Sequence, residues 1–364
     1  MCTTPTKILN PYYRVDPKKG LNFLHDCTSQ YIYTPCGHCS QCIATKQMYM
    51  IQRFQMQSLD SYVYFSTLTY DDMHLPLMDV GDFSLRFAYF KHFTDMVKRI
   101  RRNNMFGRPF SYFAVSERGT KRARPHFHCL WFIPKYSEDN LMFPYNLEKH
   151  VYDVVFNQWA VNVGSRKFPV YEKLFTYQAR VYNGVIHSNF DTHFVTPRYG
   201  YSGSESVAWY VQKYLLKLNT HDRKLQQALR LNLSDEEYNS VWPVLRSHAQ
   251  VSKGFGLGFN LDNPDDPSSS VLDYIRDCVR KTPDGSPYPC FFSPSDGSSQ
   301  PLAPYYQSRS DFYTLNDALR IHEHKDSLYN DLPDDYYNKY LASFERFQKH
   351  LRMSDFNNNS LLID

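Results

Sequence analysis

The 364-residue chain contains no apolar run approaching about 18 residues, so a membrane-spanning helix is not expected. Its first twenty residues lack the apolar core of a signal peptide, and no secretory signal is expected either. Only eight cysteines are present, three of them within seven positions. In a chain of this length, such crowding is more typical of a metal or thiol site than of a disulfide framework, and a reducing cytoplasm fits it best.

Acidic residues are scarce in one part of the chain. Residues 86–135 contain 12 Lys and Arg but only two acids, Asp95 and Glu117. Residues 1–260 carry 31 Lys and Arg against 20 Asp and Glu, whereas residues 261–364 carry 10 against 17, so the net charge of +4 divides into +11 and −7. The basic stretch favours a polyanionic substrate, although a solvated charged face would give the same pattern.

A His-x-His motif lies within this basic stretch. His126 and His128 open a run of aromatic and apolar residues that predicts a strand, and alternate residues of a strand share one face. The segment 119–123 predicts a turn, which would fold the strand back on residues 112–117 and bring Glu117 to the same face. Two imidazoles and a carboxylate in this arrangement suit a metal ion. The alternative is a pair of surface histidines on a half-buried strand.

The cysteine cluster is a second candidate metal site. Cys36, Cys39 and Cys42 follow a Cys-x-x-Cys-x-x-Cys pattern that can aim three thiolates at one structural zinc ion. A fourth ligand could come from Cys27, His25 or His38. A four-iron cluster of the ferredoxin type would need a further cysteine where Lys46 stands. The alternative is a group of free thiols.

Residue patterns divide the chain into three parts. Residues 1–60 contain a Cys-rich N-terminal segment and a helix. Residues 61–260 form the main domain, and residues 261–364 form an acidic, partly flexible region. In the main domain, residues 62–70 predict a strand. A helix is expected to begin at Asp82 or Ser84, with an apolar stripe that runs from Phe87 to Ile100.

Residues 136–200 are irregular and rich in aromatic residues, as in an insertion between two halves of a domain. A helix near 147–161 and weaker strands at 167–171 and 192–196 are expected there. The tyrosines and phenylalanines of this region could stack on unpaired bases, although such residues are more often simply core.

Residues 206–217 predict a helix without a breaker. Tyr210 and Tyr214 lie four residues apart on one face of it, and Lys213 and Lys217 follow each tyrosine by three residues. A tyrosine face usually packs against a sheet, but a repeated Tyr-x-x-Lys is unusual.

Three of these pieces resemble a known set of motifs in their order. Residues 65–70, His126-Phe127-His128 and Tyr210-x-x-x-Tyr214 resemble the motifs of rolling-circle replication initiators in the His-hydrophobic-His (HUH) endonuclease superfamily. With Pro35–Cys42 and residues 252–256 added, the chain resembles the replication initiation proteins of gokushovirus-type microviruses, which are small single-stranded DNA phages. The resemblance covers roughly residues 34–260. It implies an α+β fold, in which a central antiparallel sheet of about five strands is backed by helices.

The resemblance also implies a function. The expected reaction is nicking of single-stranded DNA at a phage origin, with Tyr210 or Tyr214 as nucleophile and with help from Lys213 or Lys217. Mg²⁺ or Mn²⁺ would be held by Glu117, His126 and His128. The residues expected to contact DNA phosphates are Arg118, Lys121, Arg122 and Arg124. Host replication proteins are expected partners in the cytoplasm of a bacterial host, with no membrane and no small-molecule cofactor.

Other functions account for part of the sequence. A non-catalytic, zinc-stabilised nucleic-acid-binding protein would use the cysteines and the basic stretch, and a related transposase or relaxase would use the same metal ligands. A zinc hydrolase acting on small molecules would explain neither the tyrosine pair nor the basic residues.

Overall fold

The computed structural model describes residues 6–9, 31–36, 40–81, 83–119, 123–182, 185–195, 220–259, 271, 273–275, 279–281, 287–292 and 299–307. The chain forms two compact units, one of residues 1–46, 280–289 and 307–364 and the other of residues 47–279 and 290–306. In the first unit, β1 (Thr6–Leu9) pairs antiparallel with β2 (Tyr31–Thr34). Among the described helices, none is both long enough and apolar enough to span a membrane.

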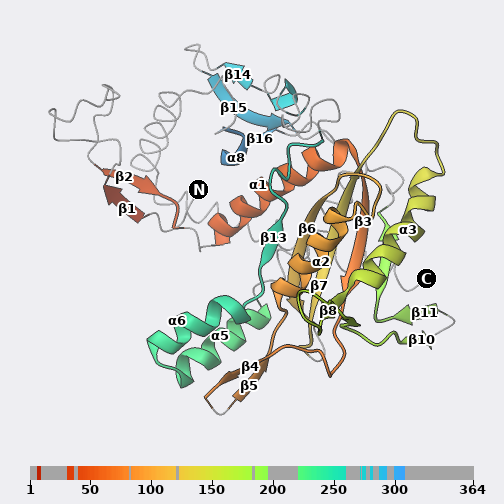
Figure 1. Ribbon diagram of the computed structural model, residues 1–364. Coiled ribbons are helices and arrows are strands. Elements are labelled where there is room, and N and C mark those ends of the chain that lie inside the picture. The colour runs from red at the N-terminus through yellow and green to blue at the C-terminus, as the bar shows by residue number, and fades with distance from the viewer. Residues whose placement is uncertain are drawn as a thin grey trace. The chain divides into compact units, whose positions relative to one another are not determined.

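The second unit is built on a five-stranded antiparallel sheet (Figure 1). The strand order is β12 (Asp191–Phe194), β3 (Ser61–Leu68), β7 (Pro125–Pro134), β6 (Ser111–Arg118) and β13 (Ala249–Val251). The three central strands are rich in β-branched and aromatic residues, which favour a pleated, buried surface. The expected α+β class, with a central antiparallel sheet of five strands backed by helices, is confirmed.

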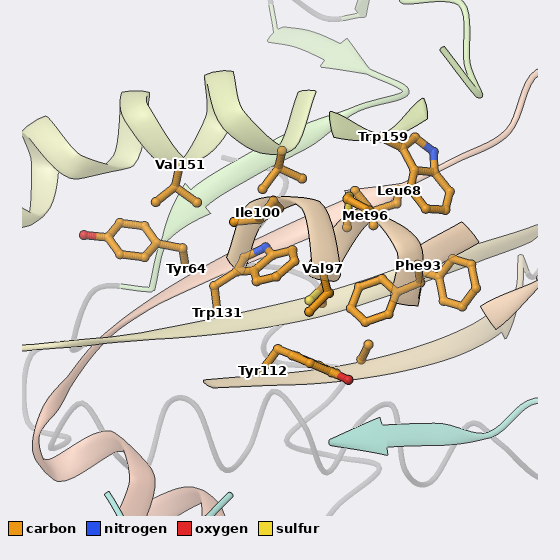
Figure 2. Packing of buried hydrophobic residues seen from close by; sticks show 14 of the residues in the cluster. Tyr64, Leu68, Phe93, Met96, Val97, Ile100, Tyr112, Trp131, Val151 and Trp159 are labelled. Atoms are coloured by element: carbon orange, nitrogen blue, oxygen red, sulfur yellow. The ribbon is translucent and has the colours of Figure 1, made fainter. Parts of the chain in front are cut away.

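One face of the sheet packs against α2 (Phe90–Arg102) and α3 (Phe143–Gln158). Trp131 lies at the centre of this face and stacks on Phe93 of α2, with 6.0 Å between ring centroids. Figure 2 shows this layer, in which Val151 of α3 and Met96, Val97 and Ile100 of α2 meet side chains from the strands. The expected apolar stripe of the helix is therefore core packing.

The opposite face packs against α1 (Ser40–Leu59). Phe54 of this helix is fully buried against Phe113 of β6 and Phe132 of β7, with ring centroids 4.7 and 5.8 Å away. Strand residues alternate between faces, so Glu117, which is four residues after Phe113, lies on this second face. We call it the α1 face.

The start of α2 differs from the expectation. The sequence predicts that the helix begins near Asp82 or Ser84, but β4 (Leu77–Val80) and β5 (Phe83–Arg86) form a hairpin there. Gly81 has a φ of 57°, which suits the turn between them. Phe87 belongs to a separate apolar cluster with α5 (Thr220–Asn232) and α6 (Asp235–Leu245), because the helix does not begin until Phe90.

The region 136–200 contributes to the main layers. It contains α3, β8 (Ala160–Asn162), β9 (Tyr171–Lys173), β10 (Ala179–Tyr182), β11 (Val185–Ser188) and β12. β12 pairs with β3 as an edge strand of the sheet, and α3 packs on the sheet through Val151 and Val155. The region is thus part of the fold rather than only an addition to it. The expected helix at 147–161 and strand at 192–196 are found with shifted ends, whereas β9 begins at the last residue of the strand expected at 167–171.

Residues beyond 260 are expected from the sequence to be appended and partly flexible. The described parts include β14 (Val279–Lys281), β15 (Pro287–Phe292), β16 (Ser299–Pro301) and α8 (Pro304–Gln307). The Gln52 side chain of α1 donates to the Pro301 carbonyl and accepts from the Ala303 amide, both at 2.8 Å. Residues 301–303 are therefore fastened to the helix behind the sheet. The expected boundaries at 60, 136, 200 and 260 stay predictions.

Candidate metal centre

Glu117, His126 and His128 converge at one end of the α1 face. Glu117 of β6 lies directly opposite His126 of β7, and the antiparallel pairing expected between these strands is confirmed. The Nε2 atoms of the two histidines are 3.0 Å apart, and Nε2 of His128 is 3.3 Å from Oε2 of Glu117. One ligand atom from each of the three side chains lies within 4.8 Å of the other two. The sequence predicts that these residues share one face of the sheet, and in the structure their ligand atoms also lie close together.

The other nitrogen of each imidazole has a partner in the protein. Nδ1 of His126 lies 3.1 Å from the carbonyl oxygen of Arg124. This oxygen can only accept, so Nδ1 donates and Nε2 is left with its lone pair. Nδ1 of His128 lies 3.3 Å from Oγ1 of Thr67 on the neighbouring strand β3. Metal-binding histidines are commonly oriented by such outer contacts.

The site is enclosed on most sides. The side chains of His128 and Glu117 are 13% and 11% exposed, respectively. The His128 ring stacks on Phe65, with 5.2 Å between ring centroids, and is perpendicular to the His126 ring. These contacts limit the rotation of the rings, so the two imidazole nitrogens are held in place before any ion binds.

The arrangement is chemically suited to a cation. Two imidazole lone pairs and a carboxylate at these distances repel one another unless a proton or a metal ion lies between them. A two-histidine, one-carboxylate set leaves further coordination positions open for water or a substrate oxygen. Among the described residues, this is the only group of three or more His, Cys, Asp or Glu side chains with that geometry.

Two of the arginines expected to contact DNA have partners within the protein. Arg118 donates to the backbone carbonyls of Arg86, at 2.7 Å, and Leu245, at 3.0 Å. Arg124 donates to the Tyr70 carbonyl at 2.7 Å and to Asp72 at 2.5 Å, and this hydrogen bond lowers the pKa of the Asp72 carboxyl. Arg118 thus ties the β4–β5 hairpin and the end of α6 to β6, which is a role in the fold that the sequence did not indicate.

Several other cations of the basic stretch also act in the fold. Arg99 is buried and donates to the carbonyls of Gln158 and Ala160, and Arg108 forms a two-point ion pair with Asp139. Fewer cationic side chains of residues 86–135 are therefore available to bind a polyanion than the net charge of this stretch suggests. Lys121 and Arg122 lie outside the described residues.

The expected nucleophile helix, residues 206–217, belongs to a part of the chain that the structure does not describe. Tyr210, Lys213, Tyr214 and Lys217 all lie outside the described residues, and their roles stay predictions. The sequence also predicts weak helices near residues 315–324 and 336–352, and both segments lie outside the described residues.

Half of the expected zinc site lies within the described residues. Sγ of Cys36 and Sγ of Cys42 are 3.9 Å apart. Two thiolates on a tetrahedral zinc ion, each about 2.3 Å from the metal, would lie about 3.8 Å apart. The pair therefore fits the proposed zinc ion, whereas Cys27 and Cys39 lie outside the described residues.

Sequence reasoning missed the residues that orient the histidines. Thr67 lies within the segment 65–70 that carries the resemblance, but nothing in the sequence shows which side chain lies opposite His128. The Arg124 carbonyl is a backbone group, which a residue pattern cannot reveal. A strand register that pairs Thr67 with His128 would have found the first of these contacts.

Comparison with known proteins points in one direction. Residues 63–219 match a family model of replication-associated proteins of the ORF2 type. The replication-associated protein ORF2 of Spiroplasma virus 4 is 28% identical over 144 residues, which cover 34% of this chain and 43% of that protein. The match thus spans less than half of that relative's length. No solved structure matches the chain. The part of the chain that contains all three converging side chains is therefore similar to replication-associated proteins, one of them viral.

Proposed function

We propose that the protein is a phage replication initiator of the rolling-circle type, which nicks single-stranded DNA at the origin. The observation that carries the proposal is the convergence of Glu117, His126 and His128 within the residues that match the replication-associated family. Its finer assignment, an HUH endonuclease of the gokushovirus type, rests on the motif order. Its partners would be origin DNA and host replication proteins, in the cytoplasm of a bacterial host.

The reaction assigned to the site is transesterification. The hydroxyl oxygen of Tyr210 or Tyr214 forms a bond to the scissile phosphorus while the bond from phosphorus to the 3′ oxygen breaks. The released 3′ oxygen takes up a proton to become the 3′-OH primer, and the other end stays attached as a 5′-phosphotyrosine. A Mg²⁺ or Mn²⁺ ion held by Glu117, His126 and His128 would polarise the phosphate and offset its developing charge.

The residues near the nucleophiles supply the remaining chemistry. An unperturbed tyrosine has a pKa of about 10, so an ammonium group from Lys213 or Lys217 would favour the phenolate. A pair of tyrosines allows one to hold the DNA end while the other attacks the regenerated origin. Lys121 and Arg122 remain candidates for phosphate contacts, and Arg124 keeps this assignment beside its role in the fold.

The test is formation of a covalent protein–DNA adduct. Purified protein is incubated with Mn²⁺ and 3′-labelled single-stranded DNA containing the candidate origin, so that the label stays on the fragment attached to the tyrosine, and the products are separated on a denaturing gel. We expect an adduct that requires the metal, is abolished by His126→Ala or His128→Ala, and is lost in the Tyr210→Phe/Tyr214→Phe double variant. Loss in one single tyrosine variant would assign that residue to initial cleavage.

Two results would contradict the proposal. An adduct that survives in the double tyrosine variant would place the nucleophile elsewhere. Binding of origin DNA without any adduct would favour a non-catalytic, zinc-stabilised nucleic-acid-binding protein, for which the 3.9 Å separation of the Cys36 and Cys42 sulfurs is the supporting observation. A related transposase or relaxase would instead form the adduct on DNA other than a phage origin.

A further inference from the structure

The loop between β8 and β9 presents apolar side chains to solvent. Val163, Phe168 and Val170 are 56%, 71% and 58% exposed, and Tyr171, at the start of β9, is 50% exposed. A single exposed apolar residue is common, but four on one short hairpin form a patch. Such a patch generally marks a surface that binds something.

The loop is held in one shape by its own side chains. Oδ1 of Asn162 accepts from the backbone amides of Gly164, at 3.0 Å, and Val170, at 2.9 Å. Oγ of Ser165 accepts from the Phe168 amide at 2.9 Å. A Cβ atom on Gly164 would lie only 2.5 Å from the Phe168 carbonyl oxygen, so the loop closes tightly around this position. Phe168 is therefore held in an exposed position by a loop whose conformation is fixed by its own hydrogen bonds.

The tip of the loop is basic as well as aromatic. Arg166 and Lys167 are both exposed and directly precede Phe168, and Nζ of Lys167 lies 5.7 Å from the centre of the Phe168 ring. The acid of the hairpin, Glu172, is instead engaged by Nε2 of His74 at 3.2 Å. An aromatic ring next to basic side chains can stack on an unpaired base while the cations contact the neighbouring phosphates.

The hairpin is fastened to the end of the sheet that holds the candidate metal centre. Thr67 pairs with His128 there, and the chain leaves β3 just beyond it. Nε1 of Trp159 donates to the Thr69 carbonyl at 2.6 Å, and the Asp71 amide donates to the Leu174 carbonyl at 3.0 Å. Trp159 and Leu174 immediately flank the hairpin, so both of its ends are anchored to the segment that follows β3.

We propose that the loop 163–170 is an accessory binding element for single-stranded DNA, in which Phe168 stacks on an unpaired base and Arg166 and Lys167 contact the adjacent phosphates. The proposal rests on the proposed function, since it gives the strand nicked at the metal centre a second contact. Its stacking would accept any base, so it would add affinity and not origin specificity.

The test is equilibrium binding of a fluorescently labelled oligo(dT) strand to the full chain, followed by anisotropy at several salt concentrations. We expect Phe168→Ala to weaken binding about tenfold. Phe83→Ala is the matched control, because Phe83 is a 63% exposed phenylalanine on the other hairpin, β4–β5, and it should bind like the wild type. Lys167→Ala should lower the slope of log affinity against log salt by about 0.7.

A further variant tests the loop's shape. Gly164→Ala keeps every side chain proposed to touch DNA but crowds the Phe168 carbonyl, so it should weaken binding as well. Circular dichroism and thermal melting of Phe168→Ala, Lys167→Ala and Phe83→Ala should match the wild type, because these side chains are exposed. Gly164→Ala should keep the circular dichroism spectrum but melt at a lower temperature, because its Cβ atom forces the backbone of the loop to shift. Wild-type affinity in Gly164→Ala would overturn the requirement for a preformed loop.

The outcomes separate this inference from the proposed function. Equal affinities of the wild type, Phe168→Ala and Phe83→Ala would overturn the loop's role while leaving covalent adduct formation untouched. Equal weakening by Phe168→Ala and Phe83→Ala would overturn it too, because the effect would not be specific to this loop. Self-association of the wild type that Phe168→Ala abolishes, without a change in DNA affinity, would make the patch a protein interface. A wild type that neither binds the strand nor forms an adduct would overturn the proposed function, and the inference with it.

Discussion

Thr67→Val is expected to weaken metal binding without removing a ligand. The Thr67 side chain contacts the candidate centre through Oγ1, which lies 3.3 Å from Nδ1 of His128. Valine has nearly the same shape and is equally suited to a strand, so β3 should keep its pairing with β7. The substitution therefore tests whether the outer hydrogen bond orients the His128 ring.

The size of the effect follows from the geometry. Loss of an outer partner of a metal-binding histidine typically reduces metal affinity by about 10- to 100-fold. The distance of 3.3 Å is longer than that of a strong hydrogen bond, and the stacked Phe65 ring still restrains His128. We therefore expect the lower end of the range, about tenfold, which equals about 1.4 kcal/mol.

The assay is isothermal titration calorimetry of the purified protein with Mn²⁺. Thr67→Ser, which keeps the hydroxyl, is the matched control and should bind close to the wild type. His128→Ala, which removes a ligand, should lose far more affinity than Thr67→Val. Equal Mn²⁺ affinities of Thr67→Val and the wild type would refute the orienting role, and a wild type that binds no Mn²⁺, Mg²⁺ or Zn²⁺ at this centre would refute the metal site.

Two further predictions concern other parts of the chain. Burial lowers the pKa of His92 to about 4, below the value of about 6.5 for an unperturbed histidine. The folded state thus resists protonation of His92, so its contribution to stability is complete above about pH 6.5 and is lost as the pH falls toward 4. Urea unfolding should therefore show that the free energy of unfolding falls less between pH 7 and pH 4 in His92→Gln than in the wild type. We expect a difference of about 1–2 kcal/mol, which is less than the full pKa shift would give, because the His92 ring is partly exposed to solvent. The same pH dependence of the free energy of unfolding in both proteins would contradict this. Elemental analysis should find about one zinc per chain, lost in a Cys36→Ser/Cys42→Ser variant, and a well-folded wild type without zinc would exclude a zinc role for the cysteines.

The convergence of Glu117, His126 and His128 could be predicted because its geometry is local in sequence. A spacing of two residues on a strand fixes a shared face, and a short turn brings Glu117 opposite His126. The β4–β5 hairpin was missed because Phe87 precedes the stripe of α2 at helical spacing, although it packs in another cluster. The role of Arg118 was missed because its partners, Arg86 and Leu245, are 32 and 127 residues away. A local sequence pattern cannot predict hydrogen bonds to backbone carbonyls so far away in the chain.

The hydrogen bonds of Gln52 have a consequence for how the protein is made. The helix α1 covers the face of the sheet that carries the three candidate metal ligands, and its Gln52 side chain hydrogen-bonds to Pro301 and Ala303. On the ribosome, α1 is synthesised long before those residues. The packing of α1 on the α1 face therefore cannot be completed until residues 301–303 have been made. Contacts 249 and 251 residues apart also slow folding. A newly synthesised protein would thus complete this packing, and with it the support for its candidate active site, only after residues 301–303 have left the ribosome.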